Sequence, residues 1–477
     1  MPIKGMVKPV QPKRKRSCIC SSLKKGMQQP LLSTVTIEGD LDPHFNIRLG
    51  ERILIISNDQ SYLTHGFHKY PTKFFPELPR WAIRKYSKEG DWVLDPMAGS
   101  GTVNVECILL KRDSIAIDVD PLARLLTRVK TTPLKEDVLT NTSNWLLAQL
   151  DNDVPSEDLA IPEFPYRDNW FRPEILIELA FIRKLIEEMP FNYISDEEVQ
   201  KYKDFYRICM SSIIRAVSNA DNNCTRTVVR KTSSPRVSIA TFLSLFKRVI
   251  ETNVPKMIEF SKRCPQDYIV DVKENDDARD ITLDKSVDLA ITSPPYINAC
   301  DYLRTHQLEM YWLGLIHDDV LANSKRRYIG TEAVKAADYR SLKTFGNPVL
   351  DKLLNDIFEE DPRKSFIVYQ YFVDMRGNLE EVKRVLKPGG RYIIVVGNNV
   401  IRGHMIPTHQ ILMDIAQSLG YKIENYFCSE VIRHFIKVPR KERIHNDWIM
   451  IFQSPSSKRR QIKNGETFRG VARTQHC

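Results

Sequence analysis

The sequence lacks the features of exported and membrane-anchored proteins. No apolar run approaches the roughly 20 residues that a helix needs to cross a membrane. The basic N-terminus is not followed by the apolar stretch of a secretory signal. The 9 cysteines show no metal-ligand spacing, and the pair at positions 18 and 20 lies in a basic tail. We therefore expect a cytoplasmic protein with reduced thiols and without a metal site.

Charge is the main departure from an ordinary composition. The 477 residues carry 70 Lys and Arg against 60 Asp and Glu, a net charge of +10. Such a charge suits a polyanionic partner, because cationic side chains neutralise phosphates and release counterions. It is also common in proteins that never meet nucleic acid. The length allows several domains, and one elaborated domain with an insertion is equally compatible with it.

The segment Thr292-Ser293-Pro294-Pro295-Tyr296 follows an apolar run, 287–291, that predicts a buried strand. The two prolines fix φ and remove two backbone donors. Carbonyl oxygens and the Ser293 hydroxyl remain as acceptors, with the Tyr296 ring beside them. Such a loop suits a planar base with an exocyclic amine, because acceptors hold the amine hydrogens while the ring stacks on the base. An ordinary turn after a strand explains this segment equally well when it is taken alone.

A second motif lies far upstream, where a predicted strand (92–94) and helix (103–111) flank Asp95-Pro96-Met97-Ala98-Gly99-Ser100-Gly101-Thr102. A strand, a glycine turn and a helix let the backbone approach a ligand closely at a helix N-terminus. The next predicted strand, 114–117, ends in Asp118, about twenty residues on, where an acid can accept hydrogen bonds from ribose hydroxyls. The alternative for Asp118 is a solvated turn at the end of the strand.

Together the two motifs resemble the DNA methyltransferases that modify exocyclic amines with S-adenosylmethionine. The cytosine-N4 branch of that family typically carries Ser-Pro-Pro-Tyr, whereas the adenine-N6 branch usually has Asp or Asn in the place of Ser293. The resemblance extends to residues 68–76, 301–304 and 386–391, and spans roughly 60–130 and 265–455. It implies a site-specific, cytosine-N4-specific methyltransferase of a restriction-modification system. Double-stranded DNA and a cognate restriction endonuclease would be its partners.

The same loop would serve adenine N6 or an exocyclic amine in RNA, so these alternatives stay open. A non-catalytic DNA-binding relative would carry a damaged motif, whereas both motifs are intact here. The chain contains no Pro-Cys dipeptide. This argues against methylation of a ring carbon, in which a cysteine attacks the base.

The resemblance also implies which residues form the site. The catalytic residues would be Ser293, Pro294, Pro295 and Tyr296. S-adenosylmethionine would be held by Lys73, Phe74, Asp95, Pro96, Met97, Gly99, Gly101, Thr102, Asp118 and Asp277. We prefer Asp277 to Asp276 because the resembling motif is Asp-Ala-Arg.

The order of the motifs predicts a Rossmann-like α/β fold with a mostly parallel sheet, an antiparallel closing strand and a helical insertion. We divide the chain into a basic tail (1–35), a cofactor-binding half (36–134), a helical insertion (135–264), a catalytic half (265–455) and a second basic tail (456–477). The insertion would either help to recognise the target or only brace the sheet. Five cations crowd one predicted loop and favour phosphate contact: Arg433, Lys437, Arg440, Lys441 and Arg443.

Several further elements are predicted from periodicity. We expect a helix that starts at Pro121, and one long helix over 298–315 in which Tyr302, Tyr311 and Trp312 pack in the core. A helix over 366–386 would be ended by the glycines at 389 and 390. After a strand (391–396) and a helix (411–419), strands 422–427 and 448–452 would form the antiparallel pair that closes the sheet.

Overall fold

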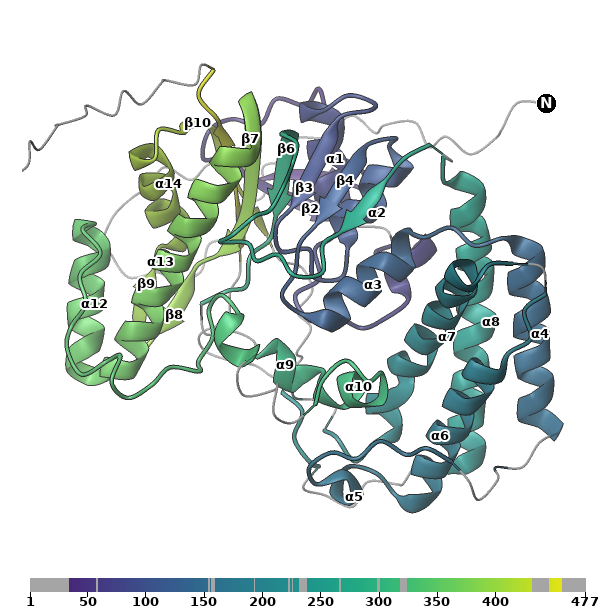
Figure 1. Ribbon diagram of the computed structural model, residues 1–477. Helices are drawn as coiled ribbons and strands as arrows, with labels where there is room; N and C mark the ends of the chain where they lie inside the picture. The colour runs from purple at the N-terminus through teal and green to yellow at the C-terminus, as the bar shows by residue number, and fades with distance from the viewer. Residues whose placement is uncertain are drawn as a thin grey trace, which may run out of the picture.

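The structure is a computed structural model that describes residues 34–56, 59–152, 155, 159–192, 194–221, 224, 226–230, 238–265, 267–297, 301–317, 324–430 and 446–456. Its centre is a nine-stranded sheet with the order β1-β2-β10-β11-β7-β6-β3-β4-β5 (Figure 1). The strands are β1 (Val35–Glu38), β2 (Arg52–Ile56), β3 (Trp92–Asp95), β4 (Asp113–Ala116), β5 (Val270–Val272), β6 (Val287–Thr292), β7 (Leu386–Gly397), β10 (Lys422–Glu430) and β11 (Asn446–Gln453). Two short strands, β8 (Asn399–Ile401) and β9 (His404–Ile406), form a separate hairpin.

Every pairing in the large sheet is parallel except those of β11, which runs antiparallel to both β7 and β10. The predicted Rossmann-like, mostly parallel sheet is therefore confirmed. The predicted antiparallel pairing of β10 and β11 is confirmed, but this pair does not close the sheet. β2 pairs with β10 through Cys428 and Arg52, and β1 follows as the outermost strand. These strands satisfy the backbone groups that β10 would otherwise expose at an edge.

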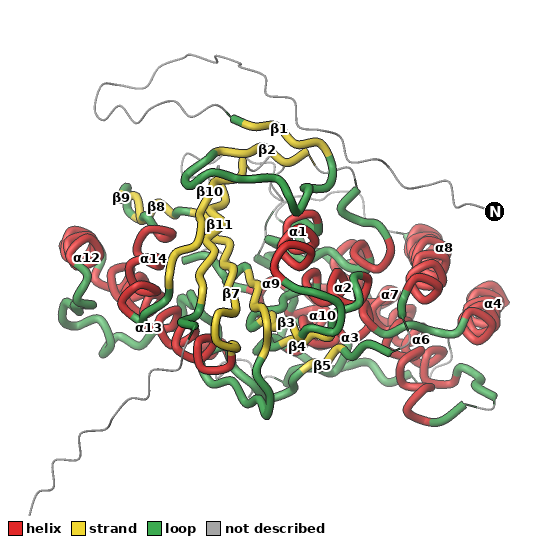
Figure 2. The backbone as a smooth tube through the Cα atoms, turned by 90° about the horizontal axis from the view of Figure 1, so that it is seen from above, coloured by secondary structure: helices red, strands yellow, loops and turns green. Residues whose placement is uncertain are grey.

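Helices cover both faces of the sheet, so its central strands are buried on both sides (Figure 2). One face packs against α13 (Pro362–Val385) and α14 (Thr408–Ser418), and the other against α1 (Glu77–Tyr86) and α2 (Thr102–Leu109). α12 (Pro348–Glu360) packs on α13. Alternate residues of β7 show the division: Ile394 and Val396 belong to the first core, and Ile393 and Val395 to the second. This follows from the two-residue period of a strand.

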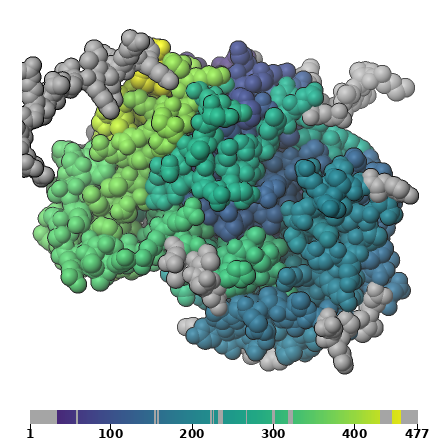
Figure 3. Space-filling model, in the orientation of Figure 1, coloured from purple at the N-terminus to yellow at the C-terminus, as the bar shows by residue number. Residues whose placement is uncertain are grey.

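A third core lies beside the sheet, in a lobe of helices at the lower right of Figure 3. The lobe contains α4 (Glu136–Asn152), α5 (Arg167–Trp170), α6 (Pro173–Glu188), α7 (Asp196–Val217) and α8 (Ile239–Arg263). Its apolar residues join those of α3 (Pro121–Thr131), which begins at the predicted Pro121. The domain boundaries themselves stay a prediction. None of the described helices is long and apolar enough to span a membrane.

Two predictions for the catalytic half were wrong in detail. The expected helix over 298–315 is two short helices, α9 (Tyr302–Thr305) and α10 (Gln307–Trp312), because His306 between them leaves helical geometry at φ −111° and ψ 17°. The glycines at 389 and 390 do not follow a helix end but lie within β7, which begins directly after α13. A Cβ at Gly390 would lie 2.8 Å from the Asp288 carbonyl oxygen, so glycine permits a close approach of two strands. The part of the chain that the structure describes also contains two short 3-10 helices, η1 (Leu63–Gly66) and η2 (Lys325–Arg327).

Candidate active site

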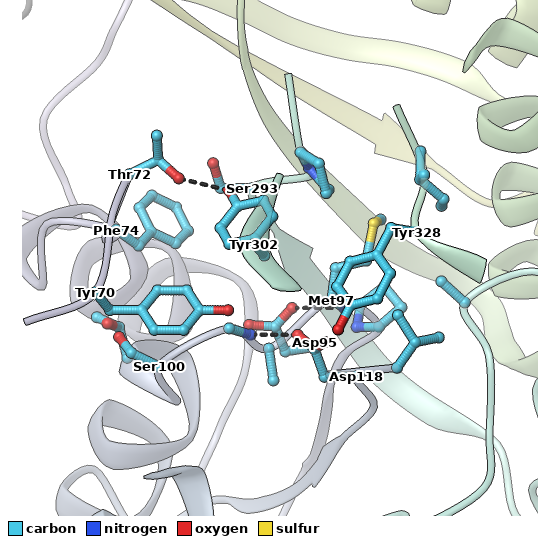
Figure 4. Close-up of a pocket in the computed structure, with 18 of the residues that line it drawn as sticks. Tyr70, Thr72, Phe74, Asp95, Met97, Ser100, Asp118, Ser293, Tyr302 and Tyr328 are labelled. Carbon is cyan, nitrogen blue, oxygen red and sulfur yellow. Dashed lines mark hydrogen bonds between the residues drawn. The ribbon is translucent and has the colours of Figure 1, made fainter. Parts of the chain in front are cut away.

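Four predicted site residues lie at the carboxyl ends of neighbouring strands. Asp277, Asp118, Asp95 and Ser293 follow or end β5, β4, β3 and β6, which are adjacent in the sheet and parallel. The chain winds from β3 outward through β4 to β5, and from β6 the other way to β7. Ligands of such sheets bind where the winding reverses. Here that point opens into a cavity that all four residues line. Figure 4 shows Asp95, Asp118 and Ser293 around it.

The glycine loop is held by hydrogen bonds to its backbone. Gly99 has a φ of +52°, and its amide donates to Asp118 Oδ2 at 2.7 Å. The fully buried Lys130 donates from Nζ to the Ser100 carbonyl oxygen at 2.9 Å. Gly101 does not line the cavity: a Cβ there would lie 2.7 Å from Thr127 Oγ1, so this glycine lets α2 approach α3. Its predicted role in cofactor contact stays a prediction.

Two carboxyl groups in the cavity have raised pKa values. The Asp95 carboxyl accepts hydrogen bonds from Thr292 Oγ1 at 2.8 Å and from the Met97 amide at 3.2 Å, yet burial raises its pKa to about 7. Burial, and then the neighbouring Asp120, raises the pKa of Asp118 to about 7. A ligand that brings positive charge or hydroxyl donors would favour the ionised form of both groups.

Asp277 is held by an ion pair that also shapes the cavity wall. Its Oδ2 lies 2.7 Å from Arg279 Nη2, and Arg279 also pairs with Asp374 at 3.0 Å. Burial alone would raise the pKa of Asp277, but the hydrogen bonds from Arg279 outweigh it and lower the pKa. Arg279 further donates to the Arg327 carbonyl at 2.7 Å. This bond secures the segment that places Tyr328 in the cavity wall.

The predicted catalytic loop is tied to two strands. Ser293 Oγ lies 3.2 Å from the Val395 carbonyl oxygen of β7 and donates its proton there. Because a hydroxyl has one proton and two lone pairs, the lone pairs of Ser293 stay available as acceptors. Tyr296 Oη donates to Asp447 Oδ1 of β11 at 2.7 Å. Burial raises the pKa of Asp447.

Ser293 and Pro295 line the cavity, whereas Pro294 and Tyr296 do not. The predicted stacking of a base on Tyr296 therefore stays a prediction. Of the predicted cofactor contacts other than Gly101, all nine line the cavity: Lys73, Phe74, Asp95, Pro96, Met97, Gly99, Thr102, Asp118 and Asp277. The Lys73 ammonium donates to the carbonyls of Gln60 and His65, at 2.8 and 2.7 Å. The predicted DNA-contacting residues 433, 437, 440, 441 and 443 lie outside the described residues.

Aromatic residues that were not predicted to belong to the site complete the cavity. Tyr70 and Tyr302 stack with ring centroids 5.7 Å apart and an interplanar angle of 23°. Tyr302 Oη forms a 2.7 Å hydrogen bond with Thr72 Oγ1. Tyr302 was predicted to pack in the core, but it lies in the cavity wall. The signal for Tyr70 and Thr72 was their place in segment 68–76, whereas no local pattern marked Tyr328.

Comparison with known proteins relates this chain to DNA methylases. Residues 51–124 match a family model described as DNA methylase. The Type II methyltransferase M.MvaI from Kocuria varians is 25% identical over 434 residues, which cover 84% of this chain and 91% of that protein. The Type II methyltransferase M.BsoBI from Geobacillus stearothermophilus is 23% identical and covers 75% of this chain and 78% of its own. A putative DNA modification methylase from Thermus thermophilus, solved with S-adenosyl-L-methionine, aligns with 20% of this chain and 41% of its own at 24% identity and a TM-score of 0.16.

Proposed function

We propose that this chain is an S-adenosylmethionine-dependent DNA amino-methyltransferase, on the basis of its methylase domain and its Type II relatives. We further propose that it methylates the exocyclic N4 amine of cytosine. Its substrate would be a specific sequence in double-stranded DNA, and a restriction endonuclease of the same site its partner. The observation that carries the cytosine assignment is Ser293. Its hydroxyl lines the cavity as an acceptor, at the position where the adenine branch usually has an acid or amide.

The cavity suits S-adenosylmethionine by the chemistry of its lining. The cofactor presents ribose hydroxyls, an ammonium group and a positively charged sulfonium. Asp95, Asp118 and Asp277 supply acceptors and negative charge for such groups, and Phe74 and Met97 supply apolar surface. Gly99 would bring the backbone close to the ligand at the N-terminus of α2. When bound, the cofactor supplies an electrophilic methyl group.

The residues of the catalytic loop would bind and orient the target amine. A cytosine in a duplex hides its N4 edge in pairing and stacking, so it must be extruded. Its amine is a weak nucleophile because the nitrogen lone pair is conjugated with the ring. Ser293 Oγ and the Pro294 carbonyl would accept the amine hydrogens and turn the lone pair out of conjugation. Most of the acceleration would come from this positioning and from electrostatics.

Product analysis tests the proposal. The purified protein is incubated with methyl-labelled S-adenosylmethionine and either genomic DNA or total RNA, and the nucleosides are separated after digestion. We expect the label in N4-methylcytosine from DNA, and much less label with the Ser293→Ala variant. Label in N6-methyladenine, or in RNA alone, would overturn the cytosine assignment.

A further inference from the structure

One buried hydroxyl in the cavity wall lacks a hydrogen-bond partner among the described residues. Tyr328 is only 9% exposed and lines the cavity, yet its Oη forms no hydrogen bond within that part of the chain. A buried hydroxyl without a partner destabilises the folded protein, because it has given up its hydrogen bonds to water. In a cavity wall, such a group points to a ligand that supplies the missing bond.

The chain around Tyr328 is held in place on both sides. Arg279 donates to the Arg327 carbonyl oxygen at 2.7 Å, directly before the tyrosine. Two residues after it, Gly330 packs against the predicted catalytic loop, because a Cβ there would lie 3.1 Å from the Tyr296 carbonyl oxygen. The Tyr328 ring itself belongs to the core of the helical lobe. A ligand that meets this hydroxyl therefore meets a pre-organised group, and little further ordering is needed.

Two carboxyl groups face the Tyr328 hydroxyl. Burial, and then the negative charges of Asp120 and Asp118, raise the pKa of Tyr328 well above its usual range. Asp120 Oδ2 is buried and, like Tyr328 Oη, has no hydrogen-bond partner among the described residues. The approach of these two side chains is therefore too long or too bent to satisfy either group. In Figure 4 the Tyr328 hydroxyl points toward Asp118. It stays protonated at neutral pH, so it offers one donor and two acceptor positions.

The ligand group that belongs beside Asp118 is a ribose hydroxyl. Asp118 follows β4, at the place where an acid accepts hydrogen bonds from ribose. The ribose of S-adenosylmethionine presents two adjacent hydroxyls, and each of them can donate and accept. An ionised carboxyl group can only accept. Tyr328 supplies the donor that Asp118 lacks, so the two side chains together match the ribose better than Asp118 does alone.

We propose that the Tyr328 hydroxyl binds a ribose hydroxyl of S-adenosylmethionine, beside Asp118. Tyr328 then contributes to cofactor binding from the catalytic half of the chain. Because the segment that carries it also packs against the predicted catalytic loop through Gly330, the cofactor and that loop share one support. The inference rests on the proposed function, since it takes S-adenosylmethionine as the ligand.

The test measures the binding of S-adenosylhomocysteine to the full chain by isothermal titration calorimetry. Tyr328→Phe keeps the ring and removes the hydroxyl, so the affinity should fall about 3- to 10-fold, the effect of one net hydrogen bond. The ligand-free variant should melt at the temperature of wild type or above it, because the lost hydroxyl has no partner in the described structure.

The 2′-deoxy and 3′-deoxy analogues of S-adenosylhomocysteine identify the group that Tyr328 binds. One of them lacks the ribose hydroxyl to which Tyr328 bonds, and wild type and Tyr328→Phe should bind that analogue with equal affinity. The effects of the two deletions are then not additive, as expected for groups in direct contact. The inference is wrong if Tyr328→Phe loses the same factor of affinity for both analogues as for S-adenosylhomocysteine.

Tyr371→Phe is the matched control. Tyr371 Oη is also buried without a partner in the described part of the chain, but Tyr371 does not line the cavity. This variant should bind S-adenosylhomocysteine as wild type does.

Two further results would overturn the inference. In the first, Tyr328→Phe binds S-adenosylhomocysteine as tightly as wild type. In the second, ligand-free Tyr328→Phe melts well below wild type, because the hydroxyl would then have a partner within the protein. Wild-type protein that binds no S-adenosylhomocysteine would contradict the proposed function as well. A product of N6-methyladenine would contradict only the cytosine assignment.

Discussion

The two sides of the cavity are built in different ways. On the proposed cofactor side, a contiguous strand, loop and helix hold the glycine loop, and the bond from the Gly99 amide to Asp118 joins residues only 19 apart. On the proposed target side, hydrogen bonds between distant segments hold both the cavity wall and the loop behind it. Thr72 and Tyr302 are 230 residues apart, and Tyr296 and Asp447 are 151 apart. Local changes to the backbone should therefore weaken cofactor binding. Binding of the target base should instead be weakened by changes in segments that are far apart in the sequence.

The largest effect should come from the backbone of the glycine loop. Gly99→Val should weaken S-adenosylmethionine binding by about 100-fold or more, because a branched side chain is strained at positive φ and would project toward the cavity. A Cβ at this position would already lie 3.4 Å from the Tyr70 ring. Isothermal titration calorimetry measures the change.

Gly101→Ala is the matched control for this prediction. Its Cβ would clash with Thr127 at 2.7 Å, behind the cavity. The variant should therefore have a lower melting temperature than the wild type. The protein that remains folded should bind S-adenosylmethionine with an affinity close to that of the wild type. Equal affinity of wild type and Gly99→Val would show that the loop does not contact the cofactor.

Loss of the Ser293 hydroxyl, the proposed amine acceptor, should slow methyl transfer and leave cofactor binding almost unchanged. Ser293→Ala should slow methyl transfer by about 100-fold, as the loss of a positioned hydrogen-bonding group does in other active sites. The affinity for S-adenosylmethionine should stay within a few-fold. Single-turnover kinetics with saturating cofactor measures the rate. A variant that methylates at the wild-type rate would mean that the loop is only structural.

The negative charge of Asp118 should strengthen the binding of S-adenosylmethionine. Asp118→Ala should weaken S-adenosylmethionine binding by about 1–3 kcal/mol through the loss of a charged hydrogen bond. Asp118→Asn is the sharper comparison, because its side-chain oxygen can still accept from the Gly99 amide. If Asn restores full affinity, Asp118 acts by supporting the loop and not by its charge.

The last prediction is a pH dependence of S-adenosylmethionine affinity. The pKa values of Asp95 and Asp118 are raised to about 7 in the ligand-free protein. Below that pH both carboxyls are protonated, so binding of a cation must displace their protons. S-adenosylmethionine affinity should fall as the pH is lowered from 8 to 6, by at most about tenfold per unit for each carboxyl. S-adenosylhomocysteine, which lacks the sulfonium charge, should show a weaker dependence, and equal slopes for both ligands would contradict the charge argument.

Some parts of the site were open to prediction from the sequence because their signals are local. Gly99 and Asp118 belong to one strand–loop–helix–strand unit, whose composition and spacing are enough to mark it. The limits of this reasoning appear at Gly101, which shares the motif but packs against Thr127. They appear again at Tyr302, which was predicted to pack in the core as part of one long helix, although it lines the cavity. Motif membership and hydrophobic pattern do not report which way a side chain points.

The sequence by itself determined that the glycine loop and the loop proposed to bind the target amine would both follow buried strands, because strand periodicity and turn residues act over a few positions. Only the tertiary structure decided that β3 and β6 are neighbours, so that Asp95 and Ser293 meet in one cavity. It also decided that β2 extends the sheet beyond β10 and that Arg279 secures the segment bearing Tyr328. Strand order and such long-range bonds depend on how whole faces pack together, and no short stretch of chain contains that information.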